Sequence, residues 1–309
     1  MEPICFSPLY MTRVWGGRSL EKNYGRTLPD DQPYGESWEM TDREGEQSIV
    51  EEGPFKGKSL HDLWTTHREE LFGSGFEGER FPLLIKILDA RDDLSIQVHP
   101  PQDVAQELGG EPKTEMWYIA DCDPGAKLYV GFRKGVTRAD FEASLLDGSV
   151  AEKVHAIQPL PGDSIFIPSG RLHAIGAGFL IYEIQQNSDT TYRVFDWNRM
   201  GLDGKPRDLH VGQSMKSIDF DDVEPEMDIP NGPVLASCEY FVVEQIEIPV
   251  DGRIGNSGDH FSIVTVVSGQ LRSSEGRVFQ AGDFFLLPRG ASPLDSPKGA
   301  RVLKTYLPV

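Results

Sequence analysis

Short runs in which hydrophobic and polar residues alternate are the main pattern along this chain, and they predict β-strands. In the segment 94–99 the alternation is strict, so Ser95, Gln97 and His99 share one face of the strand while the aliphatic residues share the other. Further strands are expected in apolar or alternating runs at 36–40, 47–50, 81–88, 113–119, 155–162, 164–167, 179–185 and 300–306. This many short strands indicates a mainly β protein.

Three segments show helix start and stop signals instead. Ser59 is a predicted N-cap with Asp62 three residues later, and this helix is expected to end at Gly73. Two shorter helices are expected at 101–108 and 137–146. Because these segments fall between predicted strands, we interpret them as insertions into a β framework.

One spacing of glycine, proline and histidine residues occurs twice. The first copy consists of Gly162, Pro168, Gly170 and His173. The second copy keeps the spacing but ends in a proline, with Gly282, Pro288, Gly290 and Pro293. A strand is predicted inside each copy and another after it, so the repeat indicates a duplicated β-module. The spacing forms the second half of the cupin signature, and the chain resembles a two-cupin protein. That resemblance implies two cupin-type jelly-roll barrels with a few inserted helices.

The two copies predict two modules with different roles. We expect an N-terminal catalytic cupin module at 1–230, with the helical insertions, and a C-terminal degenerate cupin module at 231–309. The polar and acidic stretch 196–231 is expected to connect them. Because only the first copy keeps its histidine, we predict one functional site in the first module and a scaffold role for the second.

Composition and charge narrow the classes of partner. The chain has 309 residues with 30 basic and 49 acidic side chains, and its net charge of −19 argues against nucleic acid and against an anionic membrane surface. Its 3 cysteines are odd in number and far apart, which is typical of reduced thiols in a cytoplasmic protein. No signal peptide is predicted, and the most apolar run, 81–88, is interrupted by Lys86 and too short to span a bilayer.

Four residues from distant segments are candidates for one metal site. Gln97 and His99 share a strand face, Glu115 lies on the strand that follows, and His173 ends the first copy of the repeated motif. Two imidazoles and a carboxylate are the ligand set of an open zinc or iron site, and an amide oxygen could add a weaker fourth ligand. The remaining histidines have no such context and are interpreted as structural: His61, His67, His155, His210 and His260.

At these residues the chain resembles type I mannose-6-phosphate isomerase in its short bacterial form. The resemblance rests on LLIKILDARDDLSIQVHP (83–100), PKTEMWYI (112–119), PGDSIFIPSGRLHAIG (161–176) and IYEIQQNSDTTYRVFDWNR (181–199), with VWGG and GESWEM nearer the start. Gln-x-His in place of the general cupin His-x-His is also what that family shows.

The resemblance implies one zinc ion per chain, held by His99, Glu115 and His173 with Gln97 as the fourth ligand. It also implies an active-site arginine at Arg193, a pocket lysine at Lys113, acidic residues near the substrate at Glu183 and Asp189, and a pocket serine at Ser95. The implied reaction interconverts mannose 6-phosphate and fructose 6-phosphate through a cis-enediol.

Chemical reasoning assigns roles to some of these residues and leaves others open. Zinc would act as a Lewis acid, and Arg193 would add a fixed positive charge, unless it serves as a salt-bridge partner of Asp189 or Asp196. Glu183 is one candidate for the base; a histidine outside the ligand set or a hydroxide ion at the metal is the other. The phosphate of the substrate needs nearby cations, for which Lys86, Lys113 and Arg193 are candidates.

Two alternative functions fit the same residues. A metal-dependent cupin oxygenase would use this ligand set with iron, although it needs no phosphate-binding cations. A sugar-binding regulatory cupin without turnover would keep the fold, although the intact ligands and Arg193 argue against it. The sequence leaves the oligomeric state open.

Overall fold

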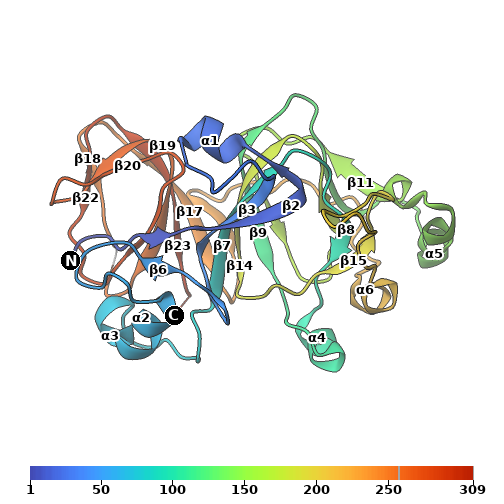
Figure 1. Cartoon of the computed structure of the whole chain (residues 1–309), viewed down its shortest axis with the longest axis horizontal. Helices are drawn as coiled ribbons and strands as arrows, with labels where there is room; N and C mark the ends of the chain where they lie inside the picture. The colour runs from blue at the N-terminus through green and yellow to red at the C-terminus, as the bar shows by residue number, and fades with distance from the viewer. Residues whose placement is uncertain (257, 309) are drawn as a thin grey trace.

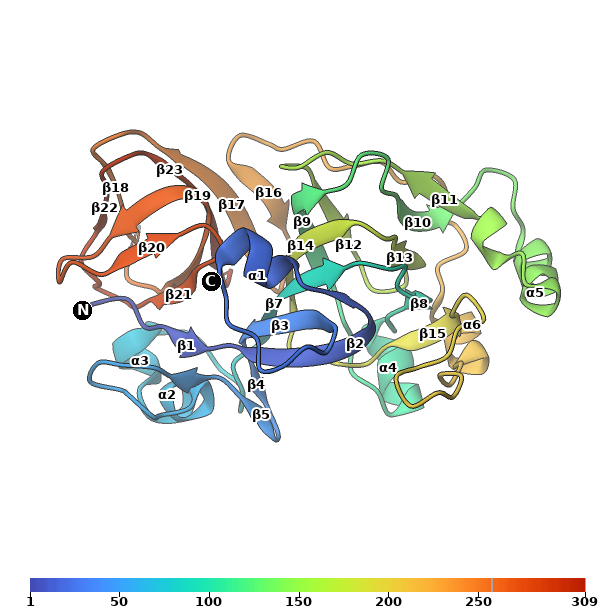
Figure 2. The same cartoon turned by 45° about the horizontal axis from the view of Figure 1, so that its top comes forward.

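Two β-barrels lie side by side in the computed structural model, which describes residues 1–256 and 258–308 (Figure 1). The first barrel is closed by two antiparallel sheets that face each other (Figure 2). The six-stranded sheet contains, in spatial order, β12 (Ser164–Ile167), β9 (Glu115–Cys122), β14 (Phe179–Gln186), β7 (Leu83–Ala90), β2 (Leu9–Gly17) and β3 (Tyr34–Met40). The five-stranded sheet contains β11 (Val154–Ile157), β10 (Leu128–Phe132), β13 (His173–Ile175), β8 (Ile96–Val98) and β15 (Tyr192–Phe195).

The second barrel is built around the long strand β19 (Ser262–Arg272). Its other strands are β16 (Val234–Ser237), β17 (Val242–Ile248), β18 (Gly252–Ile254), β20 (Val278–Gln280), β21 (Phe284–Leu287), β22 (Leu294–Ser296) and β23 (Ala300–Tyr306). Two small ribbons near the N-terminus pair β1 (Phe6–Ser7) with β6 (Ile49–Val50), and β4 (Asp42–Arg43) with β5 (Glu46–Gln47). The predicted mainly β fold with cupin-type barrels is confirmed.

The helices are short and lie outside the barrels (Figure 1). They are α1 (Ser19–Tyr24), α2 (Leu60–Thr66), α3 (Arg68–Leu71), α4 (Gln102–Leu108), α5 (Arg138–Asp147), α6 (Val211–Ser217) and the 3₁₀ helix η1 (Val150–Glu152). The predicted cap of α2 is confirmed, because Ser59 forms a capping box with Asp62, and Thr137 caps α5 in the same way with Asp140. In the part of the chain that the structure describes, no helix is long and apolar enough to cross a membrane.

Three sequence expectations were wrong in detail. The strand expected at 155–162 ends at Ile157, because a turn at Gly162, whose φ is 98°, precedes β12. The strand expected at 94–99 is only three residues long, and Leu94 lines the interior cavity beside Ser95 instead of sharing the outer face with Ile96 and Val98. The stretch 196–231 is more than a connection: it forms α6, and its Ile218 packs against the outer face of the five-stranded sheet.

Four hydrophobic clusters hold the molecule together, and their positions locate the site. Two of them fill the barrel interiors, around Ile181 in the first and Phe285 in the second. A third covers the outer face of the five-stranded sheet with α5 and α6. The largest joins the outer face of the six-stranded sheet, through residues such as Ile87 and Met116, to the second barrel and to α2 and α3. The second barrel is therefore packed with apolar side chains, whereas part of the first barrel's interior is polar.

Candidate active site and metal centre

A row of three polar side chains crosses the five-stranded sheet inside the first barrel. Gln97 on β8 pairs with His173 on β13 at one side and with Arg193 on β15 at the other. Directly paired residues on antiparallel strands project from the same face, so all three side chains reach the same cavity.

Two further side chains meet this row from the end of β8 and from the opposite sheet. His99 Nε2 lies 3.5 Å from Glu115 Oε2, and His173 Nε2 lies 3.7 Å from Glu115 Oε1. One ligand atom from each of the three residues lies within 4.8 Å of the others, and all three side chains are buried. This group could hold a metal ion.

Backbone carbonyls fix the orientation of both imidazoles. His99 Nδ1 lies 2.9 Å from the carbonyl oxygen of Thr190, and His173 Nδ1 lies 2.9 Å from that of Arg171. A carbonyl oxygen only accepts, so Nδ1 carries the proton in each ring and donates it. Each Nε2 is then left as a lone-pair donor aimed at Glu115, which is the arrangement of metal-ligating histidines.

The electrostatics of the group also suit a cation. Burial, assisted by the charge of Lys113, lowers the pKa of His99 to about 3, and burial lowers the pKa of His173 as well. Burial by itself would raise the pKa of Glu115, but the Lys113 ammonium and the two imidazoles hold it well below its usual value. Two neutral imidazoles and an ionised carboxylate therefore face one another.

Three buried polar atoms without a partner in the described part of the chain show that a metal ion fits this site. His99 Nε2 and both carboxylate oxygens of Glu115 are buried and make no hydrogen bond to the described residues, although the Lys113 ammonium lies 3.0 Å from one of those oxygens. Leaving buried polar atoms without partners is costly, and a bound metal ion would satisfy all three.

A series of side chains with alternating charge extends across the six-stranded sheet from the metal group, the name used here for His99, Glu115 and His173. Lys113 Nζ lies 3.0 Å from Glu115 and 3.8 Å from Glu183. Lys86 Nζ lies 3.6 Å from Glu183 and 3.6 Å from Glu36. All five side chains are buried, with at most 11% of any one exposed, so these charges interact with little screening by water.

Tryptophan side chains orient two of the three glutamates of this series. Trp117 pairs with Glu183 across β9 and β14, and its Nε1 donates a 3.0 Å hydrogen bond to that carboxylate. Trp38 Nε1 donates a 2.6 Å hydrogen bond to Glu36, which also accepts one from Arg13 Nε at 2.9 Å. Burial and the carboxylate of Glu115 raise the pKa of Glu183 despite the two lysines. The pKa of Glu36 falls to about 2, because Lys86 and Arg13 outweigh its burial.

Arg193 lies at the end of the polar row and has no acidic partner among the described residues. Its Nη1 donates to the carbonyl oxygen of Asp208 at 2.9 Å, and its buried Nε makes no hydrogen bond within residues 1–256 and 258–308. Asp196 is instead bound by Arg199 and Arg207. The alternative reading of Arg193 as a salt-bridge partner of Asp189 or Asp196 is therefore wrong.

A cavity of about 260 Å³ opens onto this group. The candidates that line it are Lys86, Ser95, Gln97, Lys113, His173, Glu183, Asp189 and Arg193, while the remaining two, His99 and Glu115, contact this set from behind. Sequence reasoning missed three charged residues of the lining, Arg13, Glu36 and Arg207. The alternation in 36–40 carried a signal for Glu36, whereas nothing in the sequence pattern singled out the two arginines.

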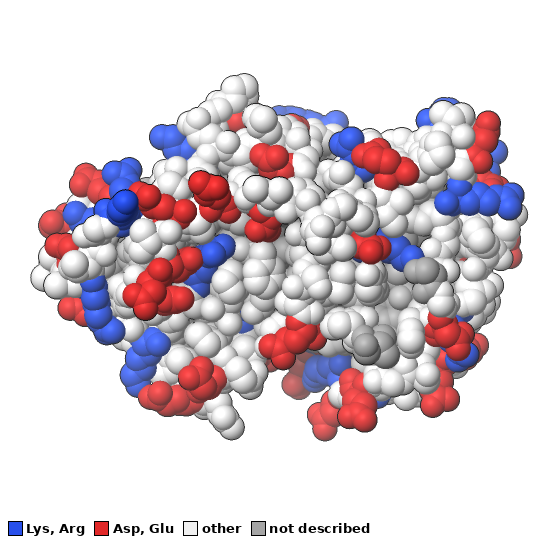
Figure 3. Space-filling view, turned by 180° about the vertical axis from the view of Figure 1, so that it is seen from behind, with Lys and Arg blue, Asp and Glu red and all other residues white. Residues whose placement is uncertain are grey.

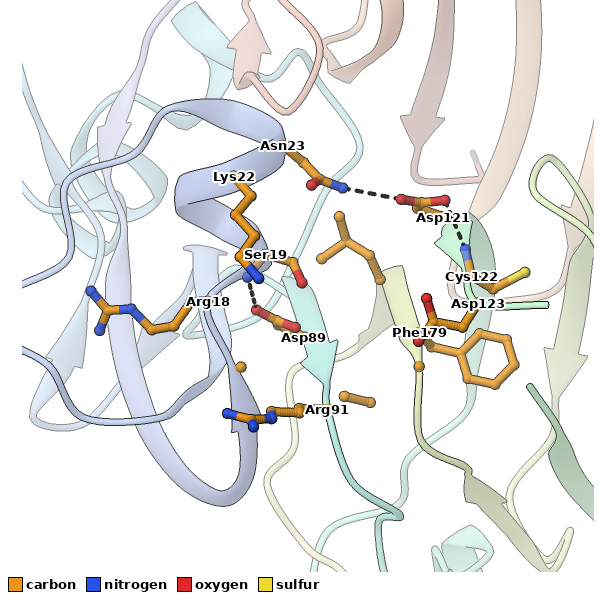
Figure 4. Close-up of a pocket in the computed structure, with 14 residues that line it drawn as sticks. Arg18, Ser19, Lys22, Asn23, Asp89, Arg91, Asp121, Cys122, Asp123 and Phe179 are labelled. Atoms are coloured by element: carbon orange, nitrogen blue, oxygen red, sulfur yellow. Dashed lines mark hydrogen bonds between the residues drawn. The ribbon is translucent and has the colours of Figure 1, made fainter. Parts of the chain in front are cut away.

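A larger cavity of about 480 Å³ lies at the far end of the same sheet (Figure 4). Its acidic and basic side chains are mostly at the surface, and its buried carboxylate, Asp89, accepts a hydrogen bond from the backbone of Ser19 at the start of α1. No histidine is among the described residues that line it. Cavity volume therefore does not distinguish the cavity beside His173, which is smaller than this one.

The fold and this group define the class of protein: a mainly β cupin with a candidate metal centre in its first barrel. Residues 5–125 match the family model described as phosphomannose isomerase type I, catalytic domain. Mannose-6-phosphate isomerase ManA of Bacillus subtilis is 38% identical over 301 residues, covering 94% of each chain. Mannose-6-phosphate isomerase of Streptococcus mutans is 34% identical, covering 93% of this chain and 92% of that one.

The comparison of structures agrees with the comparison of sequences. The crystal structure of the mannose 6-phosphate isomerase from Bacillus subtilis superposes with a TM-score of 0.88 at 33% identity, covering 99% of this chain and 100% of the other. The chain therefore belongs to the type I mannose-6-phosphate isomerase family, and it is an enzyme of the isomerase class.

Proposed function

We propose that this enzyme interconverts mannose 6-phosphate and fructose 6-phosphate with one zinc ion per chain. The observation that carries the proposal is the buried group of His99, Glu115 and His173, whose ligand atoms lie together at the inner end of a polar cavity. Two imidazoles, a carboxylate and the carboxamide of Gln97 suit zinc, which when bound supplies Lewis acidity beside the oxygens of the substrate.

Glu183 is the proposed base in this reaction. A proton must leave C2 of the open-chain aldose and return to C1 through a cis-enediol, which requires a group that both accepts and donates it. Glu183 lines the cavity, its carboxylate is fixed by Trp117, and its raised pKa brings it closer to neutral pH. We assign Lys113, between Glu183 and Glu115, to holding both carboxylates in place.

Arg193 is proposed to stabilise the negative charge that develops on the substrate. It pairs with Gln97 across the strands and so lies next to the metal group, and its guanidinium stays protonated throughout the working pH range. Its buried Nε, without a partner in the described residues, offers a donor for an anionic oxygen.

The remaining candidates are assigned to the substrate and its surroundings. Lys86 lies between two carboxylates, so we assign it to orienting Glu183 rather than to binding phosphate. Ser95 donates a 3.1 Å hydrogen bond to Gln97 Oε1 and thereby orients that amide, while Asp189 faces the cavity and is proposed to accept from a sugar hydroxyl.

We assign the chemistry to 1–230 and a supporting role to 231–309. The free cysteines fit a reducing, cytoplasmic setting.

A coupled assay for fructose 6-phosphate formed from mannose 6-phosphate tests the proposal. We expect turnover that is lost on chelation and restored by zinc. Absence of turnover with zinc present would reject the isomerase reaction, and turnover unchanged after complete removal of metal would reject the metal centre. Consumption of dioxygen would indicate an oxygenase instead.

A further inference from the structure

The second barrel carries a buried lysine at the position that Glu183 occupies in the first. The repeated glycine motif makes Trp117 and Val264 equivalent, because each lies opposite the second residue of the strand within the motif, β12 or β21. On its other side Trp117 pairs with Glu183, and Val264 pairs with Lys304. Val264 packs inside the second barrel, and directly paired residues share a face of the sheet. Lys304 therefore points into the second barrel, as Glu183 points into the first.

The residues around this position also differ in charge between the barrels. Glu244 on β17 pairs with Lys304, at the place where the first barrel has Lys86 on β7. Ser262 lies opposite the last residue of β21, whereas Glu115 lies opposite the last residue of β12. A hydroxyl thus stands where the metal group has its carboxylate. This end of the second barrel does not suit a cation, because an ammonium takes the place of an acidic side chain.

A cavity of about 210 Å³ lies beside Lys304. Lys304 lines it, although only 6% of this residue is exposed to solvent. Phe261 and Leu307 form apolar parts of the wall, and none of the described residues that line the cavity is acidic. The cavity has room for a molecule of a few carbon atoms, and the ammonium gives it a positive charge.

The ammonium of Lys304 keeps donors for a ligand. It donates to the carbonyl oxygen of Gly255 at 3.0 Å and forms no salt bridge within residues 1–256 and 258–308. The carboxylate of Glu244 instead accepts a 3.2 Å hydrogen bond from the hydroxyl of Tyr306. An ammonium has three N–H groups, so donors remain for a partner in the cavity. Burial lowers the pKa of Lys304 against the opposing effect of Glu244, so an anion beside it would stabilise its charged form.

A neighbouring polar group of the wall, Asn256, is already satisfied by the protein. Its Nδ2 donates to the carbonyl oxygens of Leu287 and Pro288 at 3.0 and 2.8 Å, and its Oδ1 accepts from the hydroxyl of Ser262 at 2.6 Å. The amide therefore holds this end of the barrel together. Lys304 is left as the charged group that would select a ligand.

We propose that the second barrel binds a small monocarboxylate, whose carboxylate pairs with Lys304 and whose short aliphatic body lies against Phe261 and Leu307. One ammonium balances one negative charge, and the apolar wall favours a ligand with a hydrocarbon part over an inorganic anion. The site lies outside the first barrel and does not depend on the proposed isomerase reaction.

Titration of the zinc-loaded enzyme with isobutyrate, followed by NMR signals of the ligand, tests this site. The native enzyme should bind isobutyrate with a dissociation constant on the order of 1 mM, as expected for a ligand of so few atoms. Isobutyramide has nearly the same shape without the charge. It should bind at least about tenfold more weakly, because hydrogen bonds between charged groups are the stronger ones.

Lys304→Met tests the role of the lysine, and Lys298→Met is the control because Lys298 is an exposed lysine of the same barrel. Lys304→Met should weaken isobutyrate binding by about 10- to 100-fold, since it removes a hydrogen bond between charged groups. Lys298→Met should bind as the native enzyme does. If Lys304→Met fails to fold, Lys304→Gln replaces it with the same expected loss, because its amide keeps a donor but carries no charge.

Several results would overturn the proposal: native affinity in the Lys304 variant, equal affinity for isobutyramide, or no binding of isobutyrate by the native enzyme. Binding that disappears when zinc is removed would do the same, because it would place the carboxylate in the first barrel. Inorganic phosphate is the comparison probe, and its affinity should be the same in Lys304→Met as in the native enzyme. A tenfold loss of phosphate affinity would show that the site takes phosphate instead. No readout involves turnover, so failure of the proposed function would leave this test unaffected.

Discussion

Gln97 and His173 face each other on adjacent strands, with the amide nitrogen of Gln97 3.3 Å from Nε2 of His173. The amide and a metal ion would compete for the same imidazole lone pair. Because amide nitrogen and oxygen occupy nearly equivalent positions, a half-turn of the carboxamide would bring its oxygen to the side of His173 and its nitrogen to Ser95, whose hydroxyl would then accept instead of donate. The same side chain can therefore support His173 without metal and serve as a ligand with it.

We expect Gln97→Ala to weaken zinc binding by about 10- to 100-fold, because it removes one ligand and the support of His173. Competition with a fluorescent zinc chelator measures the affinity. Gln213→Ala, on the exposed face of α6, is the control and should bind zinc as the native enzyme does. Equal affinities in the two variants would remove Gln97 from the metal centre.

His173→Ala should abolish stoichiometric zinc binding and activity while circular dichroism still shows a folded β protein. His155→Ala, on β11, should keep both. Zinc should also raise the unfolding temperature of the native enzyme, because a ligand at 1,000 times its Kd stabilises the folded state by about 4 kcal/mol. Zinc content by elemental analysis and thermal melts check this expectation. Zinc retained by His173→Ala would place the ion elsewhere.

Glu183→Gln should lower kcat by a factor of about 100 to 10,000 while zinc content stays at its native value. The matched control is Glu39→Gln, which removes an equally buried carboxylate that pairs with Arg26 at 2.6 Å outside the cavity. That variant should lose stability but keep kcat. Native kcat in Glu183→Gln would leave another group as the base.

Glu36→Gln should change the pH dependence of stability. The folded-state pKa of Glu36, about 2, is below its ordinary value of 4.5, so the carboxylate contributes stability that is full above about pH 4.5 and is lost as the pH falls toward 2. The variant should therefore be less stable than the native enzyme by about 3 kcal/mol at pH 7, with the difference shrinking below pH 4.5. Urea unfolding at several pH values measures this.

The control for Glu36 is an exposed ion pair of the second barrel. Glu247→Gln removes a carboxylate that pairs with Arg301 at the surface and should cost less than about 1 kcal/mol. A difference between native and Glu36→Gln that does not change between pH 7 and pH 2 would contradict the electrostatic origin of the effect. On the face that Figure 3 shows, acidic and basic side chains are interspersed. The described residues form several exposed ion pairs of this kind.

The sequence predicted the strands of the repeated motif closely, because local signals decide them. The turn glycines and the apolar runs place β12 and β21 within the two copies, and the alternation in 113–119 places Glu115 and Trp117 on one face. These local signals are enough to predict that His99, Glu115 and His173 lie together, once the cupin order of strands is recognised.

Long-range electrostatics could not be predicted in the same way. Arg207 reaches the cavity from a loop without periodicity, and its place depends on Asp196 and on the backbone of Trp197. Likewise, α6 was missed because its stability comes from packing against the five-stranded sheet rather than from capping signals. Propensity is a weak guide where tertiary contacts decide the structure.

The shared cluster between the barrels bears on how the enzyme could be improved by laboratory evolution. Strand β14 presents Glu183 to the cavity and Tyr182 and Ile184 to that cluster. Repacking on the second-barrel side, for example at Phe284, whose ring meets that of Tyr182, would shift a strand that carries the proposed base. Displacements of about 1 Å can change turnover by about 100-fold. Libraries confined to the first barrel would therefore miss rate-altering substitutions in the last quarter of the chain, at 231–309.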